Sequence, residues 1–386
     1  DTLINLFLQS WRTLIIIERR RLFLQEFWCL KNFLIGTLNN INTYIKKMNR
    51  KTYIIGEIGL CHNGNMDIAH KLIESAHKAK INAVKFQKRT VDLLATKDVL
   101  DKEDNRFPFL GKTYREIRES LEFSFDQYTE LKEHTKSLGM DFIITPFDNI
   151  ALDFINKVGV DAIKLASHSL TNLPFLKLVS KSQKPIIFST GMSTYSDIDR
   201  ALEIFKDHKN ANNLTMLHCV SSYPTPDDEC QLHFIKKLKE MYDVEIGYSG
   251  HEIGYFSSLM AVSMGANVIE RHITLDNNMD GFDHLVALNP NDLKNYVEEV
   301  EKFEKIFGDS TMDRNITNVE VVTKNKYHVS AISNNVIKLG NVILEKDIIY
   351  KNPGTGIPPK NIHFILGKRA KLDIPEDVLL NKNMFE

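Results

Sequence analysis

The sequence predicts an α/β fold, a (β/α)₈ barrel followed by a small, mostly β domain. Short apolar runs alternate with amphipathic segments from Tyr53 to Phe307, and this alternation repeats eight times. The runs are continuously apolar, as expected of strands that are buried on both faces. A barrel of this kind typically has about 250 residues. An open doubly wound sheet is the alternative, but it gives no reason for eight units.

The eight strands are expected at the apolar runs Tyr53–Ile58, Ala83–Phe86, Met140–Thr145, Ala162–Leu165, Pro185–Ser189, Leu214–His218, Val244–Gly247 and Ala266–Ile269. Helical spacing of apolar residues predicts the helices Met66–Lys80, Phe125–Ser137, Ala151–Val158, Leu173–Ser182, Ser196–Asp207, Leu232–Met241, Gly254–Met264 and Asn291–Phe307. A long polar insertion, residues 90–124, separates the second strand from its helix.

The two ends of the chain differ from this pattern. We expect the functional protein to start at Met48 and residues 1–47 to be an appended extension, with a partner-binding amphipathic helix as the alternative. Charges interrupt the extension, which matches neither a membrane span nor a signal peptide. The barrel domain is expected at 48–308, a polar linker at 309–325 and the small domain at 326–386, where short β-like runs alternate with Gly and Pro turns.

Composition excludes several classes of function. The 49 Lys and Arg residues nearly cancel the 50 Asp and Glu residues, so no overall field attracts nucleic acid or an anionic membrane. The four cysteines have no CxxC spacing, which argues against a zinc knot or a disulfide framework. We therefore expect a cytoplasmic protein with neither a nucleic-acid nor a membrane partner.

Polar side chains follow every predicted strand, and in such barrels the active site lies at these C-terminal strand ends. Lysines inside a strand end must be neutralised, and an anionic ligand would serve. A phosphate-binding ring is therefore predicted from Lys85, Thr145, Lys164, Ser189 and Ser249, with loop amides such as that of Gly191. Each member taken alone is equally explained by a structural role. The chain has no GxxxxGK[ST] or GxGxxG motif, so a nucleotide cofactor is not indicated.

Two histidines stand at equivalent positions after the last two strands. His251 and His272 would lie side by side, with Glu57 or Glu270 nearby and positions open for water or substrate. This arrangement predicts a divalent metal, Mn²⁺ or Mg²⁺, that acts as a Lewis acid on a carbonyl group. Glu270 could equally support a ligand or transfer a proton. His62 and His218 are weaker candidates, and His218 is expected to point into the core.

A further carboxylate lies just past the eighth strand. Asp283, in DGFDH (280–284), could hold a polyol hydroxyl or act as a base, although a turn carboxylate is an equal interpretation.

With these residues identified, the chain resembles the sialic acid synthase (N-acetylneuraminate synthase) family, which condenses phosphoenolpyruvate into nine-carbon 2-keto sugar acids. The matching motifs occur in family order and are IGEIGLCHNGN (55–65), AVKFQK (83–88), ITPFD (144–148), IKLAS (163–167), PIIFSTGMS (185–193), LHCVSSYPTP (217–226), IGYSGHEIG (246–254) and VIERHITLD (268–276). The tail resembles the antifreeze-like (SAF) domain of that family through IKLGNVILEKDI (337–348), NPGTGIPP (352–359) and LGKRAK (366–371).

The resemblance implies a role for each site residue. Phosphoenolpyruvate would be held by Lys85, Gln87, Thr145, Lys164, Ser167, Ser189, Ser221 and Ser249. His251 and His272 would carry the metal, and Glu57 would handle protons, with Glu270 and Asp283 as further catalytic candidates. Tyr223 and Asp283 would lie beside the sugar. The small domain would cover the barrel mouth of a partner in a domain-swapped homodimer.

Two departures from the family concern the acceptor sugar. Many members have Arg where this chain has Asn352, and an amide cannot make the same forked, charged contact. Some members have Gly-Glu where this chain has His168-Ser169. The acceptor is therefore open between N-acetylmannosamine, a related hexosamine and its 6-phosphate. A non-catalytic sugar-binding paralogue and a synthase that uses an aldose phosphate are the alternative functions.

Overall fold

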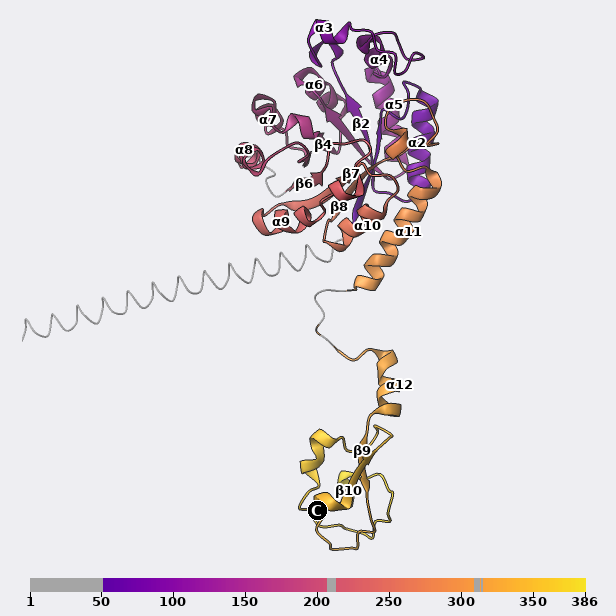
Figure 1. Cartoon of the computed structure of the whole chain (residues 1–386), viewed down its shortest axis with the longest axis vertical. Coiled ribbons are helices and arrows are strands. Elements are labelled where there is room, and N and C mark those ends of the chain that lie inside the picture. The colour runs from indigo at the N-terminus through magenta and orange to yellow at the C-terminus, as the bar shows by residue number, and fades with distance from the viewer. Residues whose placement is uncertain (1–50, 207–212, 309–312, 314) are drawn as a thin grey trace, which may run out of the picture. The chain divides into compact units, whose positions relative to one another are not determined.

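The computed structural model describes residues 51–206, 213–308, 313 and 315–386 (Figure 1). The chain divides into two compact units, Asp1–Ser310 and Thr311–Glu386, and each is described by itself. The predicted extension 1–47 and Met48 lie outside the described residues.

The first unit is a closed barrel of eight parallel strands in sequence order, as predicted. The strands are β1 (Tyr53–Gly59), β2 (Ala83–Lys88), β3 (Asp141–Pro146), β4 (Ala162–Leu165), β5 (Ile186–Ser189), β6 (Leu214–Cys219), β7 (Glu245–Gly250) and β8 (Val268–His272). The barrel closes where β8 pairs with β1, and this register sets Glu57 beside both Lys85 of β2 and His272 of β8.

Helices surround the strands (Figure 1). Those that follow the strands are α2 (Met66–Lys78), α5 (Phe125–Ser137), α6 (Asn149–Val158), α7 (Leu173–Val179), α8 (Tyr195–Phe205), α9 (His233–Met241), α10 (Phe256–Ser263) and α11 (Pro290–Phe307). The insertion after β2 contains two more, α3 (Lys97–Leu100) and α4 (Tyr114–Ser120). Several begin at capping side chains; at α5, Ser124 and Gln127 form a reciprocal capping box.

The barrel interior consists of layers that follow the two-residue period of the strands. The lower layer is a separate apolar cluster whose members are Ile55, Ala83, Ile143, Ala162, Ile187, Leu217 and Val268. Two residues further along the same strands, the layer is polar and contains Glu57, Lys85, Thr145, Lys164, Ser189, Cys219 and Glu270. The apolar layer therefore closes the barrel below and leaves the polar layer at the C-terminal strand ends.

A buried ion pair fixes the loop after β7 against β8. Arg271 and Glu252 are each 1% exposed, and Arg271 Nη1 lies 2.6 Å from Glu252 Oε1. Tyr248 Oη donates to Glu252 Oε2 at 2.9 Å, and Ser258 Oγ donates to Glu252 Oε1 at 3.0 Å. Arg271 Nη2 also donates to the backbone oxygen of Glu252 at 2.7 Å. Because Glu252 follows His251 and Arg271 precedes His272, this network holds the loops that carry both histidines.

The second unit begins with a helix that overlaps the segment expected as a polar linker, residues 309–325, and ends two residues beyond it. Helix α12 (Asn318–Tyr327) forms because Thr317 and Glu320 make a capping box, a local signal within an otherwise polar segment. Beyond it, β9 (Ser330–Ser333) pairs antiparallel with β10 (Ile348–Lys351). Other expected β-like runs make only isolated bridges, such as Ile337 with Ile374, around a small apolar core. The unit is a small antiparallel β region, as predicted, with less strand than the runs suggested.

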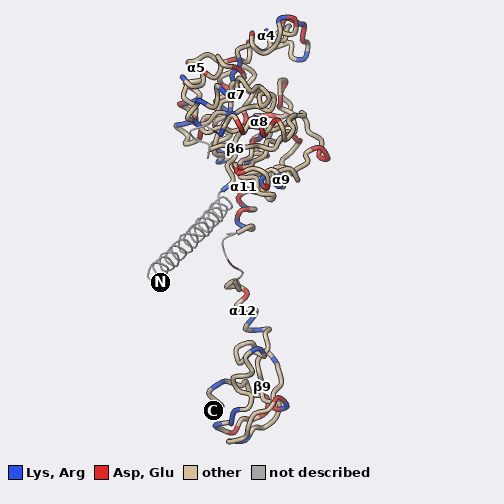
Figure 2. Tube along the Cα trace, turned by 90° about the vertical axis from the view of Figure 1, so that its left-hand side faces the viewer, with Lys and Arg blue, Asp and Glu red and all other residues tan. Residues whose placement is uncertain are grey.

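Charged residues of both signs are scattered over both units (Figure 2), in agreement with the balanced composition. Among the described residues, no helix combines the length and apolar character that crossing a membrane requires.

The buried network predicts a large stability difference between two similar substitutions. Glu252→Gln leaves the Arg271 charge buried without a counter-ion and should lower the free energy of unfolding by about 3–5 kcal/mol. Glu298→Gln, at an exposed α11 pair with Lys294, should cost no more than about 0.5 kcal/mol. Urea unfolding followed by circular dichroism measures both. An equal decrease in the free energy of unfolding in both variants would contradict a stabilising role of the buried Glu252 network.

Candidate functional site

Two lysines of the polar layer approach the same oxygen of one carboxylate. Lys85 Nζ and Lys164 Nζ each lie 3.7 Å from Glu270 Oε1. All three residues are buried, with exposures of 3%, 2% and 6%. Burial disfavours ionisation of Glu270, but the charges of Lys164 and Lys85 hold its pKa below the ordinary value. The ionisation of Glu270 at the strand ends therefore depends on the two neighbouring lysines.

The two lysines differ in their closest partners. Lys85 Nζ lies 2.7 Å from Glu57 Oε2 and donates to Thr145 Oγ1 at 3.1 Å. Burial alone would lower the pKa of Lys85, but the attraction of Glu270 and Glu57 outweighs it and raises this pKa. Lys164 Nζ instead donates to Ser189 Oγ at 2.6 Å and to the Leu165 carbonyl at 3.1 Å. Burial and the repulsion of Lys85 lower its pKa despite Glu270. Lys164 is thus the less strongly stabilised of the two ammonium groups.

Hydroxyls and a glycine loop lie beside Lys164. Gly191 N donates to Ser167 Oγ at 3.1 Å, and Ser249 Oγ donates to Glu270 Oε1 at 3.2 Å. A Cβ on Gly191 would collide with Ser221 Oγ and lie 2.7 Å from Ser167 Oγ. The absence of a side chain at Gly191 therefore lets this loop approach both serines. The predicted phosphate-binding residues come together at one end of the barrel.

The two predicted histidines lie next to each other, with ring centroids 5.6 Å apart. Nδ1 of His251 lies 2.9 Å from the Val220 carbonyl oxygen, which can only accept a hydrogen bond, so Nδ1 carries the proton. The free electron pair of the ring is therefore on Nε2. Nδ1 of His272 is buried without a hydrogen bond, and the Asp283 carboxylate is 3.8 Å away. The Tyr223 ring packs 4.0 Å from the His251 ring, between centroids.

These imidazoles fit a divalent cation as a two-ligand set. Burial lowers the pKa of both histidines, and neutral imidazole is the form that binds metal. Nδ1 of His272 makes no hydrogen bond and is therefore available as a metal ligand. Within the described ranges, no three His, Cys, Asp or Glu side chains are arranged to hold an ion, so water and substrate would have to supply the other ligands.

The remaining predicted residues fall into three groups. Gln87 lies in the site, where its amide Nε2 donates to Glu57 Oε1 at 2.5 Å. His62 and His218 are packed side chains; burial lowers the pKa of His62 to about 3, and His218 contacts the Cys230 carbonyl at 2.9 Å. Asn352 belongs to the second unit, where its Nδ2 donates to the Lys326 carbonyl at 3.1 Å.

The sequence reasoning missed three charged residues close to the site. Arg89 follows β2, contacts Gln87 Oε1 and lies 3.9 Å from the Phe147 ring centroid. Arg118 of α4 lies over the ring of Phe282, and Phe282 directly precedes Asp283. Glu122 accepts a hydrogen bond from Lys88 at 2.6 Å. The sequence signals for the two arginines are their positions, one directly after AVKFQK and the other within the polar insertion.

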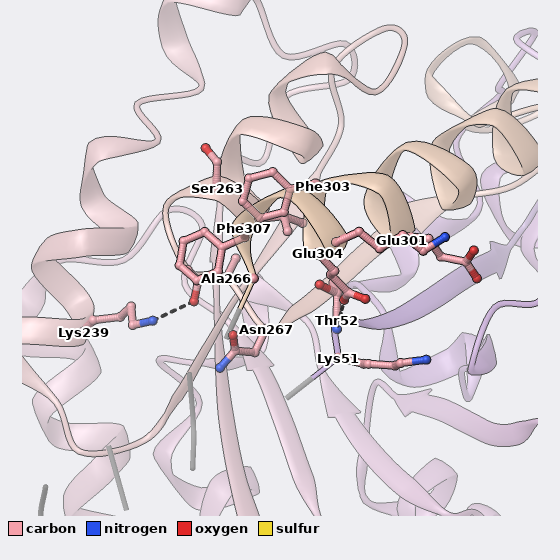
Figure 3. Close-up of a pocket in the computed structure, with 14 residues that line it drawn as sticks. Lys51, Thr52, Lys239, Ser263, Ala266, Asn267, Glu301, Phe303, Glu304 and Phe307 are labelled. Atoms are coloured by element: carbon pink, nitrogen blue, oxygen red, sulfur yellow. Dashed lines mark hydrogen bonds between the residues drawn. The ribbon is translucent and has the colours of Figure 1, made fainter. Parts of the chain in front are cut away.

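A cavity of about 550 Å³ lies at the opposite end of the barrel (Figure 3). Thr52 and Asn267, which precede β1 and β8, line it together with Phe303 and Phe307 of α11. Its rim is held by Lys239 Nζ, which donates to the Gly265 carbonyl at 2.8 Å. This cavity contains no predicted site residue, and the N-terminal face of such barrels commonly serves stability.

Comparisons with known proteins identify the family of the chain. The NeuB family model matches residues 72–312. The chain is 34% identical over 343 residues to N,N'-diacetyllegionaminic acid synthase of Campylobacter jejuni, covering 86% of this chain and 100% of that protein. It is 34% identical over 354 residues to N-acetylneuraminate-9-phosphate synthase of Drosophila melanogaster, covering 86% and 95%.

A solved structure also matches, that of an N-acetylneuraminic acid (sialic acid) synthetase from Leptospira borgpetersenii. Its TM-score is 0.63 at 32% identity, over 71% of this chain and 91% of that chain. The two relatives each match 86% of the chain. The chain belongs to the NeuB family and is a phosphoenolpyruvate-dependent synthase of the nonulosonic acid type.

Proposed function

We propose that the chain joins phosphoenolpyruvate to an open-chain N-acyl amino sugar, with addition of water, to give a nine-carbon 2-keto-3-deoxy sugar acid and phosphate. The observation that carries this proposal is the buried Lys85–Glu270–Lys164 group at the same strand ends as two adjacent imidazoles whose pKa is lowered by burial. The lysine side suits a phosphate ester and a carboxylate, and the imidazole side suits a carbonyl acceptor.

Lys164 and the nearby hydroxyls would bind phosphoenolpyruvate. The ammonium of Lys164 is held by Ser189 and lies beside the Gly191 loop, so its position is set before the ligand arrives. Ser167, Ser221 and Gly191 N form the adjacent wall. Such prearranged donors stabilise charge that develops on the departing phosphate.

His251 and His272 would hold the sugar aldehyde end. A divalent cation bound there would polarise the carbonyl group, as a Lewis acid. Tyr223 packs against His251 and provides an apolar wall for the sugar carbons. Asp283, 3.8 Å from His272, is placed to accept a hydrogen bond from a sugar hydroxyl.

The reaction forms one carbon–carbon bond and breaks one carbon–oxygen bond. C3 of phosphoenolpyruvate attacks the aldehyde carbon, whose oxygen gains a proton and becomes a hydroxyl. Water adds at C2 and loses a proton, and the resulting tetrahedral carbon releases phosphate to leave the ketone. Glu57 is the candidate for these proton transfers because Gln87 and Lys85 orient both of its oxygens.

The acceptor and the assembly belong to the same proposal. The matching relatives carry names for different products, a legionaminic acid and an N-acetylneuraminate 9-phosphate, at equal identity. N-acetylmannosamine or a relative is the proposed acceptor class. We also infer that the small domain, with Asn352, covers the barrel of a partner in a homodimer.

Phosphate release tests the reaction directly. Release should require phosphoenolpyruvate, Mn²⁺ and an N-acyl hexosamine together, and mass spectrometry should find the condensed acid. Omission of any one component should abolish it. Binding of the sugars without product formation would favour a non-catalytic role instead.

Removal of the metal should abolish activity in a way that depends on both histidines. We expect chelator treatment to stop phosphate release and added Mn²⁺ to restore it. Calorimetry should detect Mn²⁺ binding to the wild type and a loss of at least about tenfold in affinity in His251→Asn and His272→Asn. His77→Asn on the exposed face of α2 is the control. Unchanged Mn²⁺ affinity in His272→Asn would rule out this assignment.

Substitution of the buried Lys164 should specifically lower kcat/KM for phosphoenolpyruvate. Lys164→Met removes a charge-assisted contact and should lower kcat/KM for phosphoenolpyruvate by about 100-fold. Lys157→Met, on the exposed face of α6, should leave it unchanged. Steady-state phosphate release at varied phosphoenolpyruvate measures the effect. A change confined to KM of the acceptor would place Lys164 on the sugar side.

A further inference from the structure

Two arginines near the site have guanidinium groups that are buried but incompletely paired. Arg89 is 6% exposed, and its Nη1 has no hydrogen bond. Arg118, on α4, has both Nε and Nη1 buried without a hydrogen-bond partner. Buried donors of this kind are costly because they have lost water and gained no acceptor. They therefore indicate a missing anionic or strongly accepting group.

The surroundings of these arginines are short of negative charge. Glu122 is the nearest carboxylate to Arg89, at 3.8 Å from Nη1, and Lys88 already holds its Oε2 at 2.6 Å. Near Arg118, Asp104 is engaged by Arg106 at 2.6 Å. Burial lowers the pKa of Arg89 to about 10, the charge of Arg118 adds to this, and Glu122 opposes it only in part. The two guanidinium groups thus repel each other, and Glu122 balances their charge only in part.

The position of this pair relates it to the sugar end of the site. Arg89 contacts Gln87, which in turn contacts Glu57 beside His272. Arg118 lies 4.5 Å from the ring centroid of Phe282, whose neighbour is Asp283. The arginines are therefore one side chain further out than the catalytic groups. Arg89 contacts Gln87, which the family resemblance assigns to phosphoenolpyruvate, but no hydrogen bond or ion pair among the described residues joins either arginine to Lys85 or Lys164.

We propose that Arg89 and Arg118 form a subsite for a phosphate monoester at the far end of the acceptor sugar. The chain would then use an N-acyl hexosamine 6-phosphate in preference to the free sugar. This inference rests on the proposed condensation and specifies its acceptor. Guanidinium forks match phosphate oxygens in pairs, and a phosphate would supply acceptors to the unpartnered Arg89 Nη1 and Arg118 Nε and Nη1.

Selectivity follows from the same unpaired donors. A free hexosamine presents a neutral hydroxyl at that end and leaves both guanidinium groups without a counter-ion. A site that contains buried polar groups discriminates strongly against a substrate that leaves them unpaired. The preference should therefore be expressed mainly in KM for the acceptor.

The test compares N-acetylmannosamine 6-phosphate with N-acetylmannosamine, each with phosphoenolpyruvate and Mn²⁺. We expect kcat/KM for the phosphorylated sugar to be higher by about 100-fold or more in the wild type. Arg118→Gln and Arg89→Gln should each reduce this ratio by at least about tenfold. The matched control is Arg115→Gln on the same helix α4, where Asp101 and Asp92 pair with the guanidinium. It should leave the ratio unchanged.

The outcomes separate this inference from the proposed function. Equal or better use of the free sugar by the wild type would overturn the subsite and leave the condensation standing. A rise in KM for phosphoenolpyruvate in Arg118→Gln, with the acceptor ratio unchanged, would assign the arginines to phosphoenolpyruvate and overturn it also.

Calorimetry with the same two sugars decides the matter if neither is turned over. Tighter binding of the phosphorylated sugar, weakened in Arg118→Gln, would support the subsite although the condensation had failed. Equal binding would overturn it. Thermal unfolding followed by circular dichroism identifies variants that do not fold. If Arg89→Gln does not fold, the test rests on Arg118→Gln, because the Arg118 side chain is only half-buried.

Discussion

The site depends on one geometric constraint, the two-residue period of a strand in a closed barrel. Ile55 and Glu57 point to the same side, as do Ala83 and Lys85, and Ala162 and Lys164. An apolar layer therefore lies directly beneath a charged one. The apolar layer excludes water from below, which strengthens each interaction in the charged layer. A shift of one residue in any strand would turn its functional side chain toward the surrounding helices. A side chain that now faces the helices would take its place in the barrel.

Residues of β7 and β8 that face away from the barrel interior also contribute to the geometry of the site. Arg271 lies between Glu270 and His272 in sequence but points away from both, into the Glu252 network. A buried ion pair adds little net stability, yet it permits few alternative arrangements. Because Glu252 is also adjacent to His251, one network orients both imidazoles. The polar network outside the barrel thus supports the chemistry inside it.

Much of this architecture could be predicted from the sequence because barrel strands are local apolar runs. The eight strands, and the approach of Lys85, Lys164, Glu270, His251 and His272, follow from period and order alone. Contacts that depend on the path of a loop could not be predicted. Arg118 reaches the site through α4, in an insertion whose polar composition indicated only a connection. Helix α12 depends on a two-residue capping box, a weak signal in a polar segment.

The balance of charge in the polar layer has a consequence for proton transfer in the proposed reaction. Lys85 and Lys164 both approach Glu270, and their charges hold the pKa of Glu270 below its ordinary value. In the proposed reaction, phosphoenolpyruvate would bring further negative charge to this space and compete with Glu270 for the two lysines. Its arrival would therefore raise the pKa of Glu270. A carboxylic acid formed in this way beside the sugar aldehyde would be a donor for the oxygen that becomes a hydroxyl. The charges proposed to hold the phosphate ester would thus prepare the proton that the new carbon–carbon bond requires.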